Sequence, residues 1–101
     1  MTYRVRFTTD AERDLLDLYD FLADTDVPAA ERALVKLRKA FELLESFPFS
    51  CRKAEGAHGS SFIREMLVTF GDSGYVILFE IESAAIVTVL AVRHQRESDF
   101  H

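Results

Sequence analysis

Apolar and polar positions alternate at the start of the chain and then recur with a helical period. Residues 3–7 place Tyr, Val and Phe between polar residues, which is typical of a strand with one solvated face. Thr9 and Glu12 follow with the spacing of a capping box, which predicts the beginning of a helix. The apolar face of this helix consists of Ala11, Leu15, Leu18 and Leu22.

A second helix is predicted after a break at residues 24–28. Pro28 suits the first turn of a helix, and Pro48 prevents the helix from continuing beyond about Phe47. Its apolar stripe consists of Ala30, Ala33, Leu34, Leu37, Phe41 and Leu44. Residues 48–61 contain proline, glycines and serines, and we expect them to form an irregular connector.

Three strand-like apolar runs follow, over residues 62–70, 75–82 and 85–94. Turn residues at 71–74 and 83–84 join them as hairpins. The predicted fold class is therefore α+β, with an N-terminal strand, a two-helix hairpin and a three-strand antiparallel meander in one twisted sheet. A length of 101 residues predicts a single domain over residues 1–101.

The last two strands are apolar on both faces, although a hairpin of two helices covers only one face of a sheet. Tyr75 begins one apolar row, and Val76 and Leu78 contribute to the other. In the final strand the two opposed sets are Val87, Val89 and Ala91 against Ile86, Leu90 and Val92. Loops and the tail would bury such a strand on both sides, or a partner would cover it, and the pattern favours a partner surface.

Charge is spread unevenly over the chain, whose net charge is −5. Residues 10–26 hold seven acids and one base, whereas the remainder holds 10 acids and 11 bases. This distribution offers no broad basic surface and argues against strong direct binding of nucleic acid. No apolar run approaches the roughly 20 residues of a membrane helix, and the single cysteine predicts a reducing cytoplasm without an internal disulfide.

No signature for a phosphate loop, a zinc site or a hydrolase nucleophile occurs, so we expect no cofactor and no metal. Cys51 stands beside Arg52 and Lys53, a setting that would lower a thiol pKa, but it has no matched histidine and is interpreted as an ordinary residue. His58 is interpreted as a solvated loop histidine.

One polar cluster, residues 93–97, lies at the end of the last strand and contains Arg93, His94 and Arg96. Arg64 interrupts an apolar strand, and adjacent strands would bring it near this cluster. An arginine and histidine group can bind phosphate and transfer protons. The alternative, which the sequence favours over catalysis, is a structural pair between an arginine and Glu65 or Glu97.

Several segments together resemble the RelE/ParE superfamily, the toxins of bacterial type II toxin–antitoxin modules. They are AERDLLDLYDFLA at 11–23, FIREM at 62–66, GYVILFEI at 74–81 and VLAVRHQRESDF at 89–100. The resemblance covers almost the whole chain. It implies a helical hairpin on a twisted sheet, growth arrest, a role in plasmid stabilisation and an antitoxin that wraps the toxin.

The superfamily divides by target. RelE-like members cut messenger RNA in the ribosome with a cluster of Lys and Arg, or of Glu, Arg and His, often with a C-terminal tyrosine. ParE-like members poison DNA gyrase and lack that cluster. No tyrosine follows Tyr75, and residues 75–82 contain no arginine or lysine. The resemblance therefore favours a gyrase inhibitor, with Arg64, Arg93, His94 and Arg96 as target contacts. A metal-independent ribonuclease using Arg64, His94 and Arg96 stays open, as does a non-toxic interaction domain.

The partner expected from this resemblance is a ParD-like or similar antitoxin in a hetero-oligomer with the toxin. Apolar residues on the outer flank of the second helix and on the uncovered sheet face are predicted to dock it. Basic residues beside them would attract an acidic antitoxin segment. The predicted antitoxin-binding residues are Arg32, Lys36, Lys39, Ala40, Leu43 and Phe47.

Overall fold

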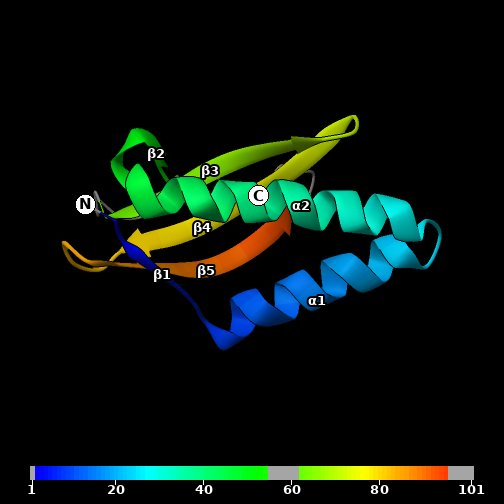
Figure 1. Ribbon diagram of the computed structural model, residues 1–101, viewed down its shortest axis with the longest axis horizontal. Coiled ribbons are helices and arrows are strands. Elements are labelled where there is room, and N and C mark those ends of the chain that lie inside the picture. The colour runs from blue at the N-terminus through cyan, green and yellow to red at the C-terminus, as the bar shows by residue number, and fades with distance from the viewer. Residues whose placement is uncertain (1, 55–61, 96–101) are drawn as a thin grey trace.

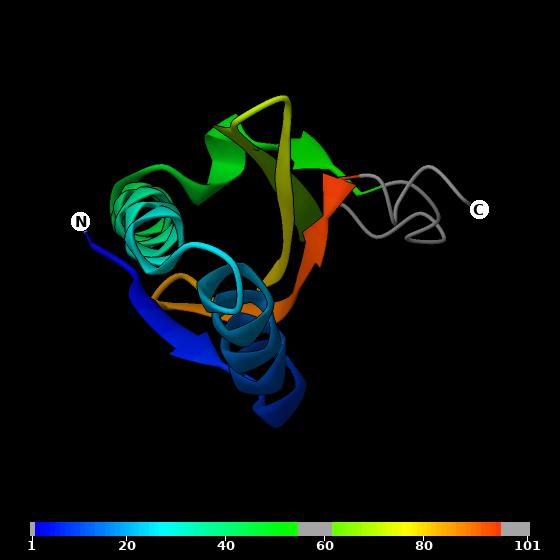
Figure 2. The ribbon, with the colours of Figure 1, turned by 90° about the vertical axis from the view of Figure 1, so that its right-hand side faces the viewer.

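The described residues, 2–54 and 62–95 of a computed structural model, form a five-stranded sheet with a helical hairpin on one face (Figures 1 and 2). The elements in chain order are β1 (Arg4–Phe7), α1 (Thr9–Ala23), α2 (Val27–Ser46), the 3₁₀ helix η1 (Pro48–Ser50), β2 (Arg52–Lys53), β3 (Ile63–Phe70), β4 (Ser73–Ile81) and β5 (Ile86–His94). The sheet order is β1-β5-β4-β3-β2. The predicted α+β fold and its β3-β4-β5 meander are confirmed.

The predicted N-terminal strand is present as β1, and one strand, β2, is added to the predicted arrangement. β1 pairs with β5 in parallel, and the chain between them, from α1 to β4, supplies the long connection that a parallel pair requires. β2 lies in the segment expected to be irregular and pairs antiparallel with β3. None of the described helices is both long enough and apolar enough to cross a membrane.

Side-chain caps determine where the two helices begin. Thr8, and not Thr9, caps α1, since its Oγ1 accepts a hydrogen bond from the Ala11 amide at 3.1 Å. Asp26 caps α2 in the same way, through the Ala29 amide at 3.1 Å, and Pro28 occupies the first turn as predicted. In Figure 1 the hairpin of α1 and α2 reaches beyond the end of the sheet.

The core lies between the helices and the sheet. Leu37 and Leu44 of α2 and Ala11 of α1 are buried there, as the apolar stripes predict. The sheet contributes a row of buried residues on the same side: Tyr75, Ile77, Phe79, Ile81, Val87, Val89 and Val92. Burial of these apolar side chains is the main favourable contribution to folding.

A β-bulge in β5 changes which of its residues face the helices. Phe79 pairs with Val89 but Leu78 pairs with Ala91, so Leu90 is the extra residue. Val92 is thereby moved to the helix side and Ala91 to the opposite side, which reverses the faces expected for these two residues.

The opposite side of the sheet is covered at its centre. Val76, Thr88 and Ala91 are only 8%, 7% and 7% exposed. The expectation that this second apolar face lacks cover within the chain is therefore wrong at these positions.

Candidate functional site

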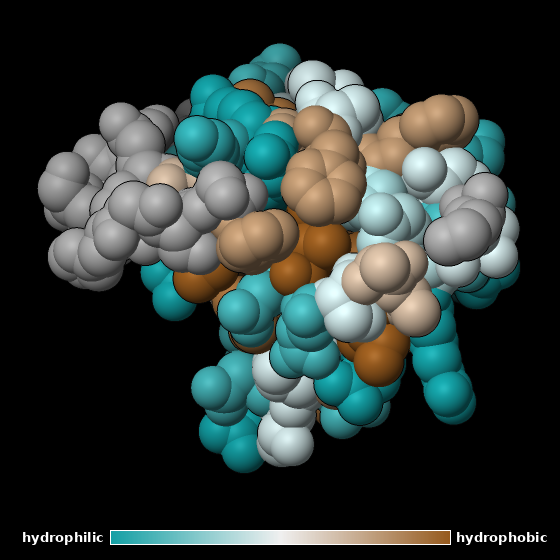
Figure 3. Space-filling model, turned by 90° about the vertical axis from the view of Figure 1, so that its left-hand side faces the viewer, coloured by the Kyte–Doolittle hydropathy of each residue, from teal (hydrophilic) through white to brown (hydrophobic). Residues whose placement is uncertain are grey.

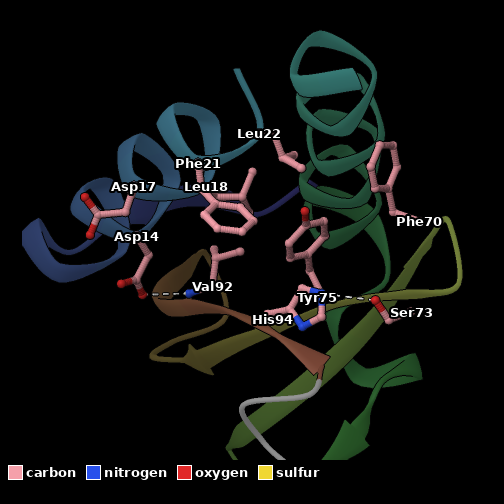
Figure 4. Close-up of a pocket in the computed structure, with 10 residues that line it drawn as sticks. All are labelled: Asp14, Asp17, Leu18, Phe21, Leu22, Phe70, Ser73, Tyr75, Val92 and His94. Carbon is pink, nitrogen blue, oxygen red and sulfur yellow. Dashed lines mark hydrogen bonds between the residues drawn. The ribbon is translucent and has the colours of Figure 1, made fainter. Parts of the chain in front are cut away.

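A cleft of about 720 Å³ opens between α1 and the sheet, at the end where β4 begins and β5 ends (Figure 4). Its size lies within the usual range of ligand pockets, roughly 300–1,000 Å³. The lining residues are Asp14, Asp17, Leu18, Phe21, Leu22, Phe70, Ser73, Tyr75, Val92 and His94. Half of these are aliphatic or phenylalanine side chains, so the cleft is suited to an apolar group with a polar neighbour.

The polar groups at the base of the cleft are held by the sheet. His94 Nε2 and Ser73 Oγ lie 3.0 Å apart, and the histidine tautomer decides which of them donates the hydrogen bond. The His94 ring meets the Tyr75 ring edge-on, with 5.7 Å between centroids. Figure 4 shows the Tyr75 hydroxyl directed toward the helices. Burial raises the pKa of Tyr75 above its usual value, so its hydroxyl keeps its proton to higher pH than an exposed tyrosine does.

The structure does not bring Arg64 and His94 together. β4 lies between the strands that carry them, and the two residues pair with different ends of it, Phe79 and Tyr75. They are therefore separated by roughly 13 Å along β4 in addition to the width of two strand spacings. The expectation that adjacent strands would bring Arg64 near the polar cluster is therefore wrong for His94.

Arg64 instead holds the segment that follows α2. Its Nη1 donates to the carbonyl oxygen of Cys51 at 2.6 Å and to that of Phe49 at 3.2 Å. Its guanidinium also lies 5.2 Å from the centroid of the Phe49 ring. Glu65, one predicted carboxylate partner, is paired with Arg52 at 2.7 Å. These contacts give Arg64 a structural role.

The two described arginine and histidine residues of the predicted cluster, Arg93 and His94, lie on opposite faces of the sheet. Arg93 is exposed and pairs with Val76, so it lies on the face of the sheet opposite to His94. Arg96, Glu97 and His58 lie outside the described residues. Within the described ranges, no group of three or more His, Cys, Asp or Glu residues could hold a metal ion.

Burial dominates the chemistry of Cys51, which is a free thiol of intermediate exposure. Burial raises the pKa of the Cys51 thiol, and a hydrogen bond from Ser50 and the charge of Arg64 oppose this shift only in part. The neighbouring basic residues therefore do not lower the thiol pKa as their sequence positions suggested.

Comparison with known proteins identifies the family. The sequence model described as "ParE toxin of type II toxin-antitoxin system, parDE" matches residues 5–99. The chain belongs to the ParE toxin family.

Similar proteins carry both names of the superfamily. Toxin RelE3 of Caulobacter vibrioides is 32% identical over 88 residues, which cover 86% of this chain and 88% of that protein. A solved structure titled "Chromosomal ParDE TA system from P. aeruginosa" matches with a TM-score of 0.68 at 14% identity, covering 92% of this chain and 96% of that one. The structural match supports the fold, and the family supports an antitoxin as partner of this ParE-family toxin.

The outer flank of α2 carries most of the side chains expected to contact that antitoxin. Leu43 and Phe47 are 53% and 62% exposed. Lys36 Nζ donates to the Thr69 carbonyl at 2.9 Å, and Arg32 and Lys39 are exposed. Ala40 is a correction, because it is only 6% exposed and belongs to the core beneath α2.

Two further exposed aromatic side chains lie outside α2, in η1 and just before β3. Phe49 in η1 and Phe62 before β3 are 51% and 52% exposed. In the space-filling view of this end, brown side chains gather at the centre of the face and are bordered by teal ones (Figure 3). This end of the toxin therefore carries exposed apolar side chains in addition to those on the flank of α2.

The cleft of this ParE-family toxin was not predicted from its sequence. Asp14, Asp17, Leu18 and Phe21 recur at helical spacing, and this was the available signal. Asp17 lines the cleft, and the Asp14 carboxylate accepts a hydrogen bond from the Val92 amide of β5. Only the packing of α1 against β5 distinguishes Asp14 and Asp17 from the other acidic residues of this helix.

Proposed function

We propose that this toxin inhibits DNA gyrase in the cytoplasm and is neutralised by a cognate antitoxin. The observation that carries this proposal is the separation of Arg64 from His94, because a ribonuclease site needs its phosphate-binding and proton-transferring groups on one substrate. Arg64 is occupied in holding η1. The match to the ParE family model favours the same target.

A ribosome-dependent endonuclease is the second candidate. The relative named Toxin RelE3 favours it, and so does His94, which is held by Ser73 beside the cleft. In this case His94 would be the proton-transferring group, and alanine at this position would reduce turnover roughly 10²-fold or more.

Two assays on the purified toxin separate these candidates. Gyrase supercoiling and accumulation of the cleavage complex are measured with increasing toxin, and messenger RNA cleavage is measured on translating ribosomes. We expect an effect on gyrase and none on the message. Ribosome-dependent cuts with unaffected gyrase would establish the endonuclease. Failure of both assays, together with normal growth on expression, would indicate a non-toxic interaction domain.

The outer flank of α2 is proposed as a docking surface of the antitoxin. Leu43 and Phe47 present exposed apolar side chains there, and Arg32, Lys36 and Lys39 form a basic border. A disordered antitoxin segment with acidic and apolar residues would fold on this flank as it binds. The toxin and antitoxin would then form a hetero-oligomer.

A further inference from the structure

The cleft beside α1 has a chemistry opposite to that of the α2 flank. Among the described residues, 2–54 and 62–95, its lining includes the carboxylates of Asp14 and Asp17 and no lysine or arginine. The segment that forms its helical wall, residues 10–26, holds seven acids and one base. A concave site lined by one sign of charge attracts the opposite charge, so the cleft favours a cationic partner.

An exposed apolar row lies along the same wall. Phe21 is 80% exposed, and Leu18 and Leu22 are partly buried below it. Figure 4 shows these three side chains over Val92 and Tyr75, which come from the sheet. Large exposed apolar side chains next to a concave apolar floor are typical of a surface that binds another protein.

The backbone of β5 beside the cleft is already hydrogen-bonded to α1. β1 pairs with β5 only as far as Val89. Beyond that point the Thr8 hydroxyl donates to the Leu90 carbonyl at 3.1 Å, and Asp14 accepts from the Val92 amide at 3.0 Å. A strand from a partner protein could not form hydrogen bonds with these two backbone groups, because both are already occupied. A helix needs no such groups and can pack its side chains against the row on α1.

We propose that this cleft binds a basic amphipathic helix of the antitoxin, with apolar side chains against Phe21 and Leu18 and a lysine or arginine paired with Asp17. The antitoxin then holds the toxin at two places of opposite charge, an acidic segment on the α2 flank and a basic helix in the cleft. The proposal rests on the antitoxin partner in the proposed function and does not depend on gyrase as the target.

The test measures the affinity of the antitoxin encoded in the same module for four toxin variants. Phe21→Asp and Asp17→Lys change the cleft. Leu16→Asp and Asp20→Lys are matched controls, because both residues are exposed on α1 and neither lines the cleft. We expect each cleft variant to bind at least tenfold more weakly and each control to stay within about twofold of wild type. Thermal unfolding of each variant alone checks that the fold is kept.

Charge exchange identifies the partner residue. Antitoxin variants in which one lysine or arginine is replaced by glutamate are measured against wild-type toxin and Asp17→Lys. One of them should bind Asp17→Lys better than it binds wild type.

Cleft variants that bind as tightly as wild type, or no more weakly than their controls, would overturn the proposal. A toxin dimer that Phe21→Asp dissociates without changing antitoxin affinity would assign the cleft to a second copy, and would also overturn it. Neither result bears on the gyrase assay, which uses toxin without antitoxin.

Discussion

The Asp14 carboxylate accepts a hydrogen bond from the backbone amide of Val92 at 3.0 Å. This contact joins α1 to β5 just after the bulge, where β1 no longer pairs with the strand. Thr8 acts similarly two residues earlier in β5, since its hydroxyl donates to the Leu90 carbonyl at 3.1 Å. Side chains of the first helix and its cap thus occupy the edge of β5 where a strand would pair, and they attach α1 to β5 beside the cleft.

Removal of the Asp14 carboxylate should destabilise the toxin. Asp14→Ala leaves the Val92 amide without its acceptor, and Val92 is only 4% exposed, so we expect a loss of about 1–3 kcal/mol in the free energy of unfolding. Asp14→Asn keeps an acceptor oxygen and should lose less. The control Asp17→Ala, at an exposed position of the same helix, should change stability by about 0.5 kcal/mol or less. Urea unfolding of the three variants measures the difference.

Two glycines near the β3–β4 turn should respond differently to alanine. A Cβ at Gly74 would overlap the Val68 carbonyl oxygen, so Gly74→Ala should disrupt the pairing of β3 with β4. Gly71 has a φ of 62° and open space around its Cβ position, so Gly71→Ala carries only backbone strain, about 1 kcal/mol. The yield of folded protein and the melting temperature distinguish the two. Equal loss in both variants would contradict this account.

Local patterns predicted the elements of this fold, but not how they are offset against one another. The periods of residues 3–47 and 62–94 predict a strand, two helices and a meander because burial of one face requires that spacing. The bulge at Leu90 depends on how β5 pairs with β4, and it exchanges the faces of Ala91 and Val92. The distance between Arg64 and His94 depends on strand order in the same way. The expected proximity of Arg64 and His94 was wrong, and the cleft was not predicted, for the same reason. Both depend on how the strands and α1 pack together, which the period of hydrophobic residues does not encode.

Arg64 should matter for stability and not for chemistry. Arg64→Ala removes hydrogen bonds to two carbonyl oxygens and the contact with the Phe49 ring, so we expect a loss of about 1–3 kcal/mol. Arg64→Lys should recover only part of this, because an ammonium lacks the planar fork of a guanidinium. The matched control is Arg93→Ala, which changes an exposed arginine on the sheet. Unchanged stability of Arg64→Ala, with loss of toxicity, would return Arg64 to the functional site.

Tyr75 should make the toxin sensitive to alkali. Burial raises the folded-state pKa of Tyr75 above its usual value of 10.0, so the folded protein keeps this proton to higher pH than the unfolded chain does. Its contribution to stability is fully present below about pH 10 and is lost as the pH rises through the folded-state pKa. Cys51 has a raised pKa as well, with a usual value of 9.0, so the comparison is made in a Cys51→Ser background. There, Tyr75→Phe should flatten the loss of unfolding free energy above pH 10.

The α2 flank provides the most direct test of antitoxin docking. Replacing Leu43 and Phe47 together by aspartate puts two charges where apolar anchors are expected, and it should weaken antitoxin binding by several kcal/mol. The matched double variant Leu16→Asp/Val27→Asp changes two other exposed apolar residues of the helices, 66% and 47% exposed, and should bind nearly as wild type. Wild-type binding should show a large negative heat-capacity change and a raised melting temperature, because the antitoxin folds on the native toxin. Calorimetry with both double variants measures the affinities. If the Leu43/Phe47 variant keeps full affinity while Phe21→Asp loses it, the antitoxin docks in the cleft and not on α2.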